Sequence, residues 1–415
     1  MKSAEQTAIA RVIARLNVGG PAMQAVVLTD AFRRKGYRTL LITGEVAASE
    51  ASMEYLANAK DVEPIRIASM SRPISLYKDF VALWQLICVL RREKPLIIHT
   101  HTAKAGTLGR LAAVVTGVPI RVHTFHGHVF QGYFPALVTR LFVSIERFLA
   151  GHSDCIVAVS DSQKRELVDV YRIAPAEKVA VIPLGLDLDP FLHVGGIESP
   201  QRGTVGDRGH TSLVGWIGRL TPIKAPNLFL DCAIAMRLAF PTVRFVMVGD
   251  GELRRECEER IQREGLGSTA SITGWRRQLA PIYAKLDLVV STSVNEGTPV
   301  VLLEAMASAR PFVATNVGGV RDLMVGCGRK IDGVEVFDNG ILVPQEVPYV
   351  AYAVRFLLER PQLRLAMGEA GREFARSRFS QHRLANDLEA LYLKLAHSKG
   401  LLPHRAPSPA LENAS

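Results

Sequence analysis

At 415 residues the chain is too long for one ordinary hydrophobic core, so its length predicts two domains. Its 48% apolar and 22% charged residues are typical of a globular protein and exclude a disordered or fibrous chain. The formal charge of +10 leaves open a nucleic-acid partner, an anionic membrane, a phosphorylated substrate or a solvated basic surface, but no nucleic-acid-binding signature accompanies it.

The cysteines and the hydropathy favour a cytoplasmic protein. The cysteines are scattered, odd in number and without metal-ligand spacing, as is typical of reduced thiols: Cys88, Cys155, Cys232, Cys257 and Cys327. The first residues run into a strand pattern without an apolar signal segment. No stretch reaches the roughly 18 uncharged apolar residues of a spanning helix, so we expect no membrane crossing.

Short β-branched segments alternate with longer amphipathic segments along the first half of the chain. This alternation predicts parallel strands joined by helical crossovers. The strands are expected at residues 10–16, 39–43, 96–99, 119–123, 155–160 and 179–183. The helices are expected at residues 23–34, 76–92, 103–115, 135–150 and 162–171.

A second alternation follows a segment at residues 195–210 that is rich in glycine and charge and is typical of a linker. Its strands are expected at residues 212–217, 243–248, 286–291 and 311–315. Its helices are expected at residues 227–238, 252–263, 300–309 and 347–358. The chain is therefore predicted to be an α/β protein with two similar doubly wound parallel sheets.

Open parallel sheets bind ligands outside the carboxyl ends of their strands, so the loops that follow the strands are the candidate sites. Gly19 and Gly20 would let the backbone approach a phosphate at a helix N-terminus, although a tight turn explains the pair equally well. In the second half, Arg219 and Lys224 could grip a diphosphate, with two solvated cations as the alternative. Gly249 ends the next strand and would hold the backbone close to a ligand.

The strongest signal surrounds Glu296, in a loop that precedes an apolar helix. Thr298 is predicted to cap that helix, with Pro299 at its first position and free N–H groups from Gly297 onward. Glu296 and Glu304 could address different hydroxyls of one extended ligand. The alternative is that Glu296 is a helix-start carboxylate and Glu304 a solvated helical charge.

Together these residues resemble the retaining glycosyltransferases of the GT-B fold in family 4. The family's glutamates, separated by seven residues, correspond to Glu296 and Glu304, and its Arg and Lys correspond to Arg219 and Lys224. Similar stretches are DCIVAVSDSQKRELV, VIPLGLDLDPF, FVMVGDGELR and ITGWRRQL. The resemblance covers nearly the whole chain and implies two Rossmann-like domains that face a central cleft.

The resemblance sets the expected domain boundaries. Residues 1–194 would form an acceptor domain and residues 212–379 a nucleotide-sugar donor domain, with a linker at 195–211. A helix at 380–400 would cross back to the first domain. Residues 401–415, poor in large apolar side chains, are expected to be disordered.

The resemblance also implies roles for single residues. Glu304 would accept hydrogen bonds from the donor ribose. Arg219 and Lys224 would bind the diphosphate and stabilise the charge that develops as it departs, and Glu296 would orient the transferred sugar. The remaining donor-binding candidates are Gly19, Gly20, Gly249, Trp275, Arg276, Gly297, Thr298 and Pro299.

Five histidines cluster near two neighbouring strand ends: His99, His101, His123, His126 and His128. A His-x-His pair can present two metal ligands, but no companion carboxylate or cysteine lies nearby. We therefore expect no cofactor and a metal-independent transfer, with fixed cations stabilising the leaving diphosphate. By resemblance, His126 contacts the transferred sugar, and the other histidines are structural or acceptor-side.

The acceptor side is the least defined. Residues 133–150 are apolar over more than one helical face, which predicts a core helix or, given the positive charge, a lipid-facing one. His101, Lys104 and Arg110 are the acceptor-side candidates, in a stretch that resembles members extending polyprenyl-diphosphate-linked sugars. We expect a hexosyltransferase that moves a sugar, with retention, from a UDP-sugar to a glycan or lipid-linked acceptor, in the cytoplasm or peripherally on the inner face of the cell membrane.

Two other functions stay open for this fold. A nucleotide-sugar epimerase would lack the set formed by the two cations and the two glutamates. A non-catalytic module that binds nucleotide sugars or lipids would bind without turnover.

Overall fold

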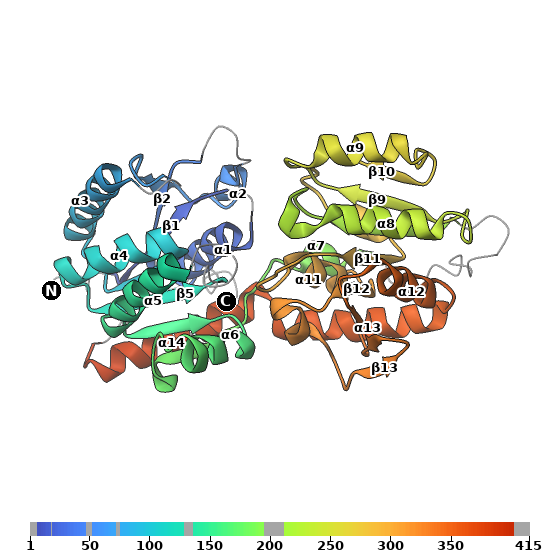
Figure 1. The fold of residues 1–415 in the computed structure, drawn as a ribbon. Coiled ribbons are helices and arrows are strands. Elements are labelled where there is room, and N and C mark those ends of the chain that lie inside the picture. Colours follow the sequence, from blue (N-terminus) through green and yellow to red (C-terminus); the bar gives the residue numbers. More distant parts are fainter. Residues whose placement is uncertain are drawn as a thin grey trace, which may run out of the picture. The chain divides into compact units, whose positions relative to one another are not determined.

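The computed structural model describes residues 6–17, 19–46, 52–71, 75–127, 136–194 and 211–401. The chain forms two α/β units, Met1–Leu186 with Gln381–Ser415 (unit 1) and Asp187–Ser380 (unit 2) (Figure 1). The division therefore falls after Leu186 and not after residue 194, because α7 (Asp189–Leu192) packs within unit 2. The expected linker at 195–210 and, beyond Leu401, the expected disordered tail lie outside the described residues.

The sheet of unit 1 has the order β3-β2-β1-β4-β5-β6-β7, and all its strand pairs are parallel. Its central strands are largely buried because helices cover both faces. The sequence did not predict β3, which has only three residues. The strands are β1 (Ala8–Arg15), β2 (Arg38–Gly44), β3 (Pro64–Arg66), β4 (Ile97–His101), β5 (Ile120–Phe125), β6 (Cys155–Ala158) and β7 (Val179–Val181).

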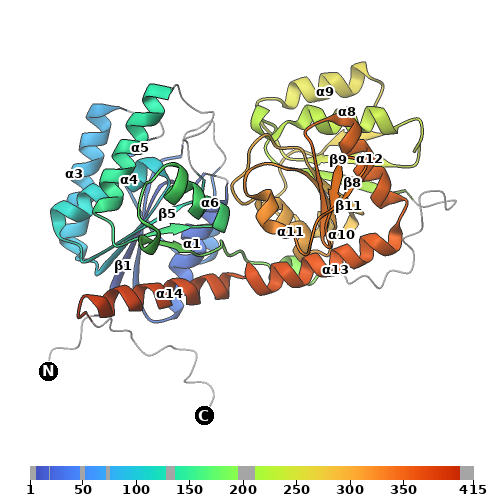
Figure 2. The same ribbon diagram turned by 60° about the horizontal axis from the view of Figure 1, so that its bottom comes forward.

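The helices of unit 1 form two layers (Figure 2). On one face α1 (Gly20–Arg34) and α14 (Gln381–Ser398) pack around Phe32, and on the other lie α3 (Leu76–Glu93), α4 (Ala103–Thr116) and α5 (Ala136–Gly151). The helix expected at 162–171 begins as α6 (Asp161–Arg165) and continues as a π-helical turn, Glu166–Val170. A short helix, α2 (Glu54–Ala59), was not predicted.

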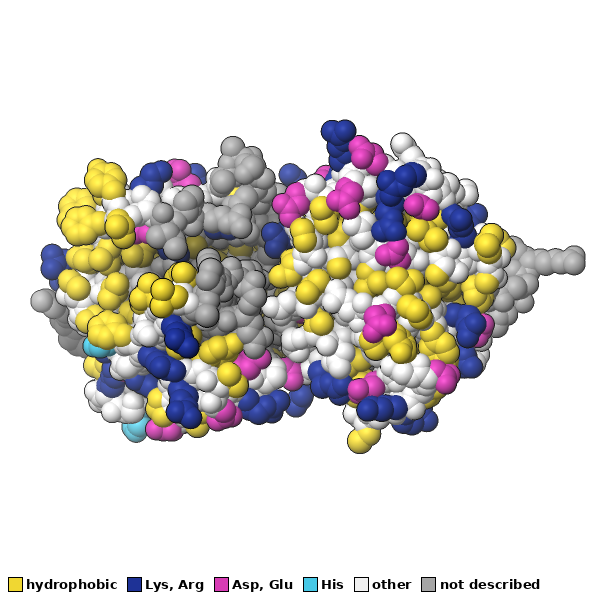
Figure 3. Space-filling view, in the orientation of Figure 1, with side chains coloured by type: hydrophobic (Ala, Val, Ile, Leu, Met, Phe, Trp, Pro, Cys, Tyr) yellow, Lys and Arg dark blue, Asp and Glu magenta, His cyan; other side chains and the backbone are white. Residues whose placement is uncertain are grey.

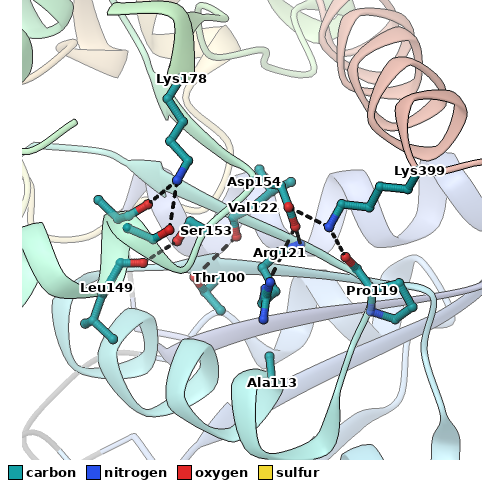
Figure 4. Close-up of polar contacts among 12 residues, drawn as sticks. Thr100, Ala113, Pro119, Arg121, Val122, Leu149, Ser153, Asp154, Lys178 and Lys399 are labelled. Carbon is teal, nitrogen blue, oxygen red and sulfur yellow. Dashed lines mark hydrogen bonds and ion pairs between the residues drawn. The ribbon is translucent and has the colours of Figure 1, made fainter. Parts of the chain in front are cut away.

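Helix α14 is fastened to unit 1 at two levels. In the core, the hydroxyl of Tyr392 lies 2.5 Å from Nδ1 of His99 on β4. At the helix end, Lys399 donates to the carbonyl of Pro119 at 2.5 Å and pairs with Asp154 at 2.6 Å (Figure 4). Asp154 in turn accepts from the backbone N–H of Arg121 at 2.7 Å. These contacts place the C-terminal helix in the same unit as the first strand.

The sheet of unit 2 is mixed, in the order β10-β9-β8-β11-β12-β15-β14-β13. Its last two strand pairs are antiparallel, an edge that the sequence did not predict because these strands have only three or four residues. The predicted core strands are β8 (Leu213–Ile217), β9 (Arg244–Val248), β11 (Leu288–Ser291) and β12 (Phe312–Thr315). The others are β10 (Ala270–Ile272), β13 (Arg329–Ile331), β14 (Val334–Val336) and β15 (Gly340–Val343).

Helices cover both faces of this sheet as well. On one face α8 (Pro226–Met236), α9 (Arg254–Arg263) and α12 (Val347–Leu358) pack around Phe245. α11 (Val300–Ala307) packs on β11 and β12 and contacts α10 (Ala280–Lys285) and α13 (Pro361–Arg378). The loops at the carboxyl ends of β8 and β11 remain for ligands.

Candidate functional site

The sheet of unit 2 has a topological switch point beside β8. The chain adds β9 and β10 on one side of β8 and then returns to add β11 on the other. In doubly wound sheets ligands bind outside the carboxyl ends of the strands at such a point. Arg219 and Lys224 lie in the loop that follows β8, and Glu296 lies in the loop that follows β11. The structure therefore places three predicted residues in the two loops that flank the switch point.

Lys224 and Glu296 form an ion pair between these loops. Nζ of Lys224 lies 2.5 Å from Oε1 of Glu296, and the hydroxyl of Ser293 donates to the same oxygen at 2.6 Å. The side chains of Lys224 and Glu296 are 25% and 9% exposed. The pair is thus shielded from most of the solvent, while the lysine stays accessible to a ligand.

Glycines allow the loops at the carboxyl ends of the unit 2 strands to pack closely against one another. A Cβ at Gly249 would lie 1.8 Å from the carbonyl oxygen of Gly218. A Cβ at Gly318 would lie 1.9 Å from the carbonyl oxygen of Glu296, which accepts from the N–H of Gly319 at 3.1 Å. Gly249, predicted as a point of ligand approach, therefore has a packing role of its own. Gly318, which the sequence analysis missed, holds the Glu296 loop in place.

Glu304 is buried in α11 and contacts Tyr283 of α10. The Tyr283 hydroxyl lies 3.0 Å from Oε2 of Glu304 and 3.0 Å from the carbonyl oxygen of Val301. A neutral Glu304 can donate to Tyr283 while Tyr283 donates to Val301, whereas an ionised Glu304 competes with Val301 for one phenolic proton. Burial raises the pKa of Glu304 to about 7. The interpretation of Glu304 as a solvated helical charge is therefore wrong.

Three other donor-binding candidates of unit 2 lie at the surface. Arg219 is exposed, and its guanidinium has no partner among the residues that the structure describes. Trp275, 46% exposed, and Arg276, also exposed, follow β10. Arg219 can therefore reorient toward a ligand without breaking an existing contact of its guanidinium. The side chains of Trp275 and Arg276 are exposed and accessible to a ligand.

The start of α11 differs from the prediction. The helix begins at Val300, the extended residue Pro299 is its N-cap, and the side chain of Thr298 makes no capping hydrogen bond. The predicted cap at Thr298 is wrong because Pro299, predicted as the first helical residue, is itself the N-cap. The half-buried Gly297 lies against Gly319, where a Cβ would come within 2.1 Å of its carbonyl oxygen.

Unit 1 has its own switch point, between β1 and β4. Gly19 is the N-cap of α1, and Gly20 is the first residue of that helix. A Cβ at Gly19 would meet only Cδ of Pro21, at 3.8 Å, and its φ of 161° is extended. Neither packing nor a left-handed backbone requires glycine at this position, which argues against the tight-turn alternative.

His101 and His126 meet at the carboxyl ends of β4 and β5. Nδ1 of His101 lies 2.9 Å from Nε2 of His126, so one ring donates and the other accepts. Although part of His126 remains exposed, burial lowers its pKa to about 4, and His126 is therefore neutral at pH 7. His99 and His123 are buried in the core, and His128 lies outside the described residues.

The acceptor-side candidates Lys104 and Arg110 have structural partners. Lys104 pairs with Asp79 of α3 at 2.5 Å, and Arg110 pairs with Glu146 of α5 at 2.7 Å. Arg110 is 1% exposed and His101 0% exposed, so an acceptor can reach neither, and the predicted acceptor contact of Arg110 is replaced by a bond between two helices. Lys104 remains half-buried at the start of α4.

Two further contacts of the site escaped the sequence analysis. Ser293 precedes Glu296 by three residues, a spacing at which a hydroxyl can reach a carboxylate, and the sequence could have indicated it. Tyr283 reaches Glu304 from another helix, and no local pattern announces that contact.

The described residues contain no group of three or more His, Cys, Asp or Glu side chains arranged to hold a metal ion. None of the helices in the described residues is long and apolar enough to span a membrane.

Comparison with known proteins matches both halves of the chain to glycosyltransferases. Residues 18–190 match the family model described as Glycosyltransferase Family 4, and residues 211–360 match the one described as Glycosyl transferases group 1. UDP-Gal:alpha-D-GlcNAc-diphosphoundecaprenol alpha-1,3-galactosyltransferase of Escherichia coli is 30% identical over 66% of this chain and 73% of its own. D-inositol 3-phosphate glycosyltransferase of Segniliparus rotundus is 32% identical over 75% of this chain and 68% of its own.

A solved structure agrees with the fold. Anabaena HepE, in complex with UDP and glucose, matches over 94% of this chain and 99% of its own, with a TM-score of 0.72 and 19% identity. This likeness shows the GT-B fold of two Rossmann-like α/β units.

Proposed function

The chain belongs to the family 4 glycosyltransferases, also described as glycosyl transferases group 1, and we propose that it transfers a hexose, with retention, from a UDP-sugar to a polyprenyl-diphosphate-linked glycan. As a member of this family it is a glycosyltransferase that uses a nucleotide-sugar donor. The ion pair of Lys224 and Glu296 at the switch point of unit 2 is the observation that carries the proposal.

The donor side of the proposal follows from charge and burial. Lys224 and the exposed Arg219 supply positive charge for a diphosphate, and Glu304 supplies a buried acceptor for ribose hydroxyls. Because Glu296 is already held by Lys224 and Ser293, its second oxygen can accept from the transferred sugar. UDP is favoured because the name of the Escherichia coli relative specifies UDP-Gal and HepE binds UDP.

The chemistry of the proposal is electrostatic. As the glycosidic bond to the diphosphate breaks, negative charge grows on the leaving group and positive charge on the sugar. Lys224 and Arg219 stabilise the first, so the transfer is proposed to be independent of a metal. A neutral His126 can hydrogen-bond a sugar hydroxyl without itself carrying positive charge.

A lipid-linked acceptor is proposed because the Escherichia coli relative is named for a diphosphoundecaprenol-linked GlcNAc acceptor. Such an acceptor stays in the membrane with its sugar exposed. We therefore place the reaction in the cytoplasm, at the inner face of the cell membrane.

A transfer assay tests the proposal. The purified chain is incubated with UDP-sugars and a water-soluble, short-chain, diphosphate-linked GlcNAc, with and without a chelator. We expect UDP release that depends on the acceptor, resists chelation and yields a product whose anomeric proton signal matches that of the donor. UDP release that does not depend on the acceptor would contradict transfer to this acceptor. An inverted anomer would contradict retention, and loss of activity with the chelator would contradict metal independence.

A further inference from the structure

Large apolar side chains lie exposed on three neighbouring helices of unit 1. Leu76 of α3 is 88% exposed and Leu137 of α5 is 79% exposed. Most exposed large apolar side chains of the described chain belong to these helices: Leu76, Tyr77, Phe80 and Trp84 on α3, Val114 and Val115 on α4, and Leu137, Val138, Leu141 and Phe148 on α5. A soluble monomer rarely leaves such residues contiguous and uncovered.

The three helices form one surface, which we call the α3–α4–α5 face. α4 contacts both neighbours, and ion pairs tie it to each: Asp79 with Lys104 joins it to α3, and Arg110 with Glu146 joins it to α5. Figure 3 shows hydrophobic side chains gathered over this side of unit 1, at the left of the view. The exposed apolar side chains therefore lie on three helices that pack side by side.

The exposed charges on this face are all positive. The carboxylates of the three helices are half-buried or buried, and each is engaged by a basic residue: Asp79 by Lys104, Glu93 by Arg38 and Arg92, and Glu146 by Arg110. The exposed ionised side chains are Lys78, Arg91, Arg92, Arg140 and Arg147. Apart from Arg92, which pairs with Glu93, these cations have no carboxylate partner among the described residues of the three helices. A surface that combines apolar residues with an excess of cations is complementary to anionic lipid headgroups above acyl chains.

A bilayer suits this composition better than a second copy of the chain. In a symmetric dimer through this face the cations of one copy would meet those of the other, and like-charge contacts are costly. The amphipathic rings of Tyr77 and Trp84 are typical of the headgroup level, and Lys78 and Arg140 have stems long enough to keep their charge in water. We propose that the α3–α4–α5 face docks onto the surface of an anionic membrane.

Docking through the apolar residues at the starts of α3 and α5 would bring the carboxyl edge of the unit 1 sheet near the membrane. In a parallel sheet with helical crossovers, each helix begins at the carboxyl edge, and α4 begins two residues after His101. The apolar residues of α3, from Leu76 to Trp84, lie in its amino-terminal half. An acceptor sugar on a lipid diphosphate would meet this edge without its tail leaving the bilayer, a consequence that rests on the proposed function.

Vesicle sedimentation of the full chain, without substrates, tests the docking. Vesicles of phosphatidylcholine with phosphatidylglycerol are compared with phosphatidylcholine alone, at low and high salt. We expect binding to the anionic vesicles that high salt weakens. The triple variant Tyr77→Ser, Phe80→Ser and Trp84→Ser should lose affinity by about tenfold or more, whereas the matched control Leu238→Ser, an 87% exposed residue of unit 2, should bind like wild type.

Several results would overturn the docking: no binding to anionic vesicles, equal binding to neutral ones, or unchanged binding of the triple variant. A wild-type dimer that the triple variant converts to a monomer with unchanged vesicle binding would identify a second copy as the occupant. Transfer to the water-soluble acceptor should be unchanged in the triple variant. If vesicle binding holds but no transfer occurs, the proposed function fails and the docking stands.

Discussion

The hydroxyl of Tyr283 lies 3.0 Å from Oε2 of Glu304, in a region that excludes most water. The contact joins α10 to α11 and fixes the carboxyl group that we assign to the donor ribose. The same hydroxyl also faces the carbonyl of Val301 at 3.0 Å, so an ionised Glu304 shares one phenolic proton with Val301, while burial raises the pKa of Glu304 to about 7.

The first prediction concerns the pH dependence of stability. Burial raises the pKa of Glu304 from its ordinary 4.5 to about 7, so the unfolded chain releases this proton at lower pH than the folded chain does. The stabilising contribution of the protonated group is complete below pH 4.5 and is lost as pH rises through about 7. Glu304→Gln should therefore gain stability relative to wild type as pH rises through this window, by about 3 kcal/mol at most. Urea unfolding across the window measures it, and a constant difference between the two proteins would contradict the assignment.

The second prediction concerns UDP binding. Ribose hydroxyls donate best to an ionised carboxylate, so wild-type affinity should rise with pH up to about 7, by as much as about tenfold per pH unit. Glu304→Gln should bind UDP more weakly at alkaline pH and retain only the pH dependence of the UDP phosphates. Calorimetric titrations of both proteins make the comparison, and parallel profiles would remove Glu304 from the donor site.

The third prediction separates the two cations. Lys224→Ala and Arg219→Ala should each lower kcat by about 10²- to 10³-fold, because each removes fixed charge from the leaving diphosphate. Only Lys224→Ala leaves a largely buried carboxylate unpaired, so it alone should lower the free energy of unfolding, by about 1–3 kcal/mol.

The double variant Lys224→Ala with Glu296→Gln serves as the control, since it removes the unpaired charge. It should recover stability without recovering turnover. Recovery of both would mean that the ion pair is purely structural.

The fourth prediction concerns the Gly318 turn. Gly318 has φ of 49°, and a Cβ there would collide with the carbonyl of Glu296, whereas Gly117 has φ of 71° and open space around it. Gly117→Ala should lower the free energy of unfolding only by the strain of a left-handed backbone, about 1 kcal/mol. Gly318→Ala should cost more and weaken UDP binding, because the Glu296 loop must move. Thermal melts of the two variants with and without UDP make the comparison. Equal loss of stability and equal stabilisation by UDP in both variants would mean that the contact of Gly318 with the carbonyl of Glu296 has no role.

The sequence by itself determined the fold class, most strands and helices, and the loops that carry the site. Hydrophobic periodicity is local, so the strands of unit 1 other than β3 were predicted to within a few residues. The three-residue strands β3, β10, β13 and β14 were not predicted, because so few residues carry no period. The equally short β7 was predicted because it lies within the apolar run at residues 179–183. The sequence spacing of Glu296 and Glu304, and that of Arg219 and Lys224, could be recognised because each set lies within one strand–loop–helix segment.

Only the tertiary structure decided how these residues are partnered. Burial of Glu304 depends on Tyr283, which comes from another helix, and the environment of Glu296 depends on Lys224 and Gly318 from other loops. Arg110 suggested an acceptor contact by its motif, but packing of α4 against α5 turned it into a partner of Glu146. The charge and chemistry of a side chain are encoded locally, whereas its exposure and its pKa depend on the distant segments that fold against it.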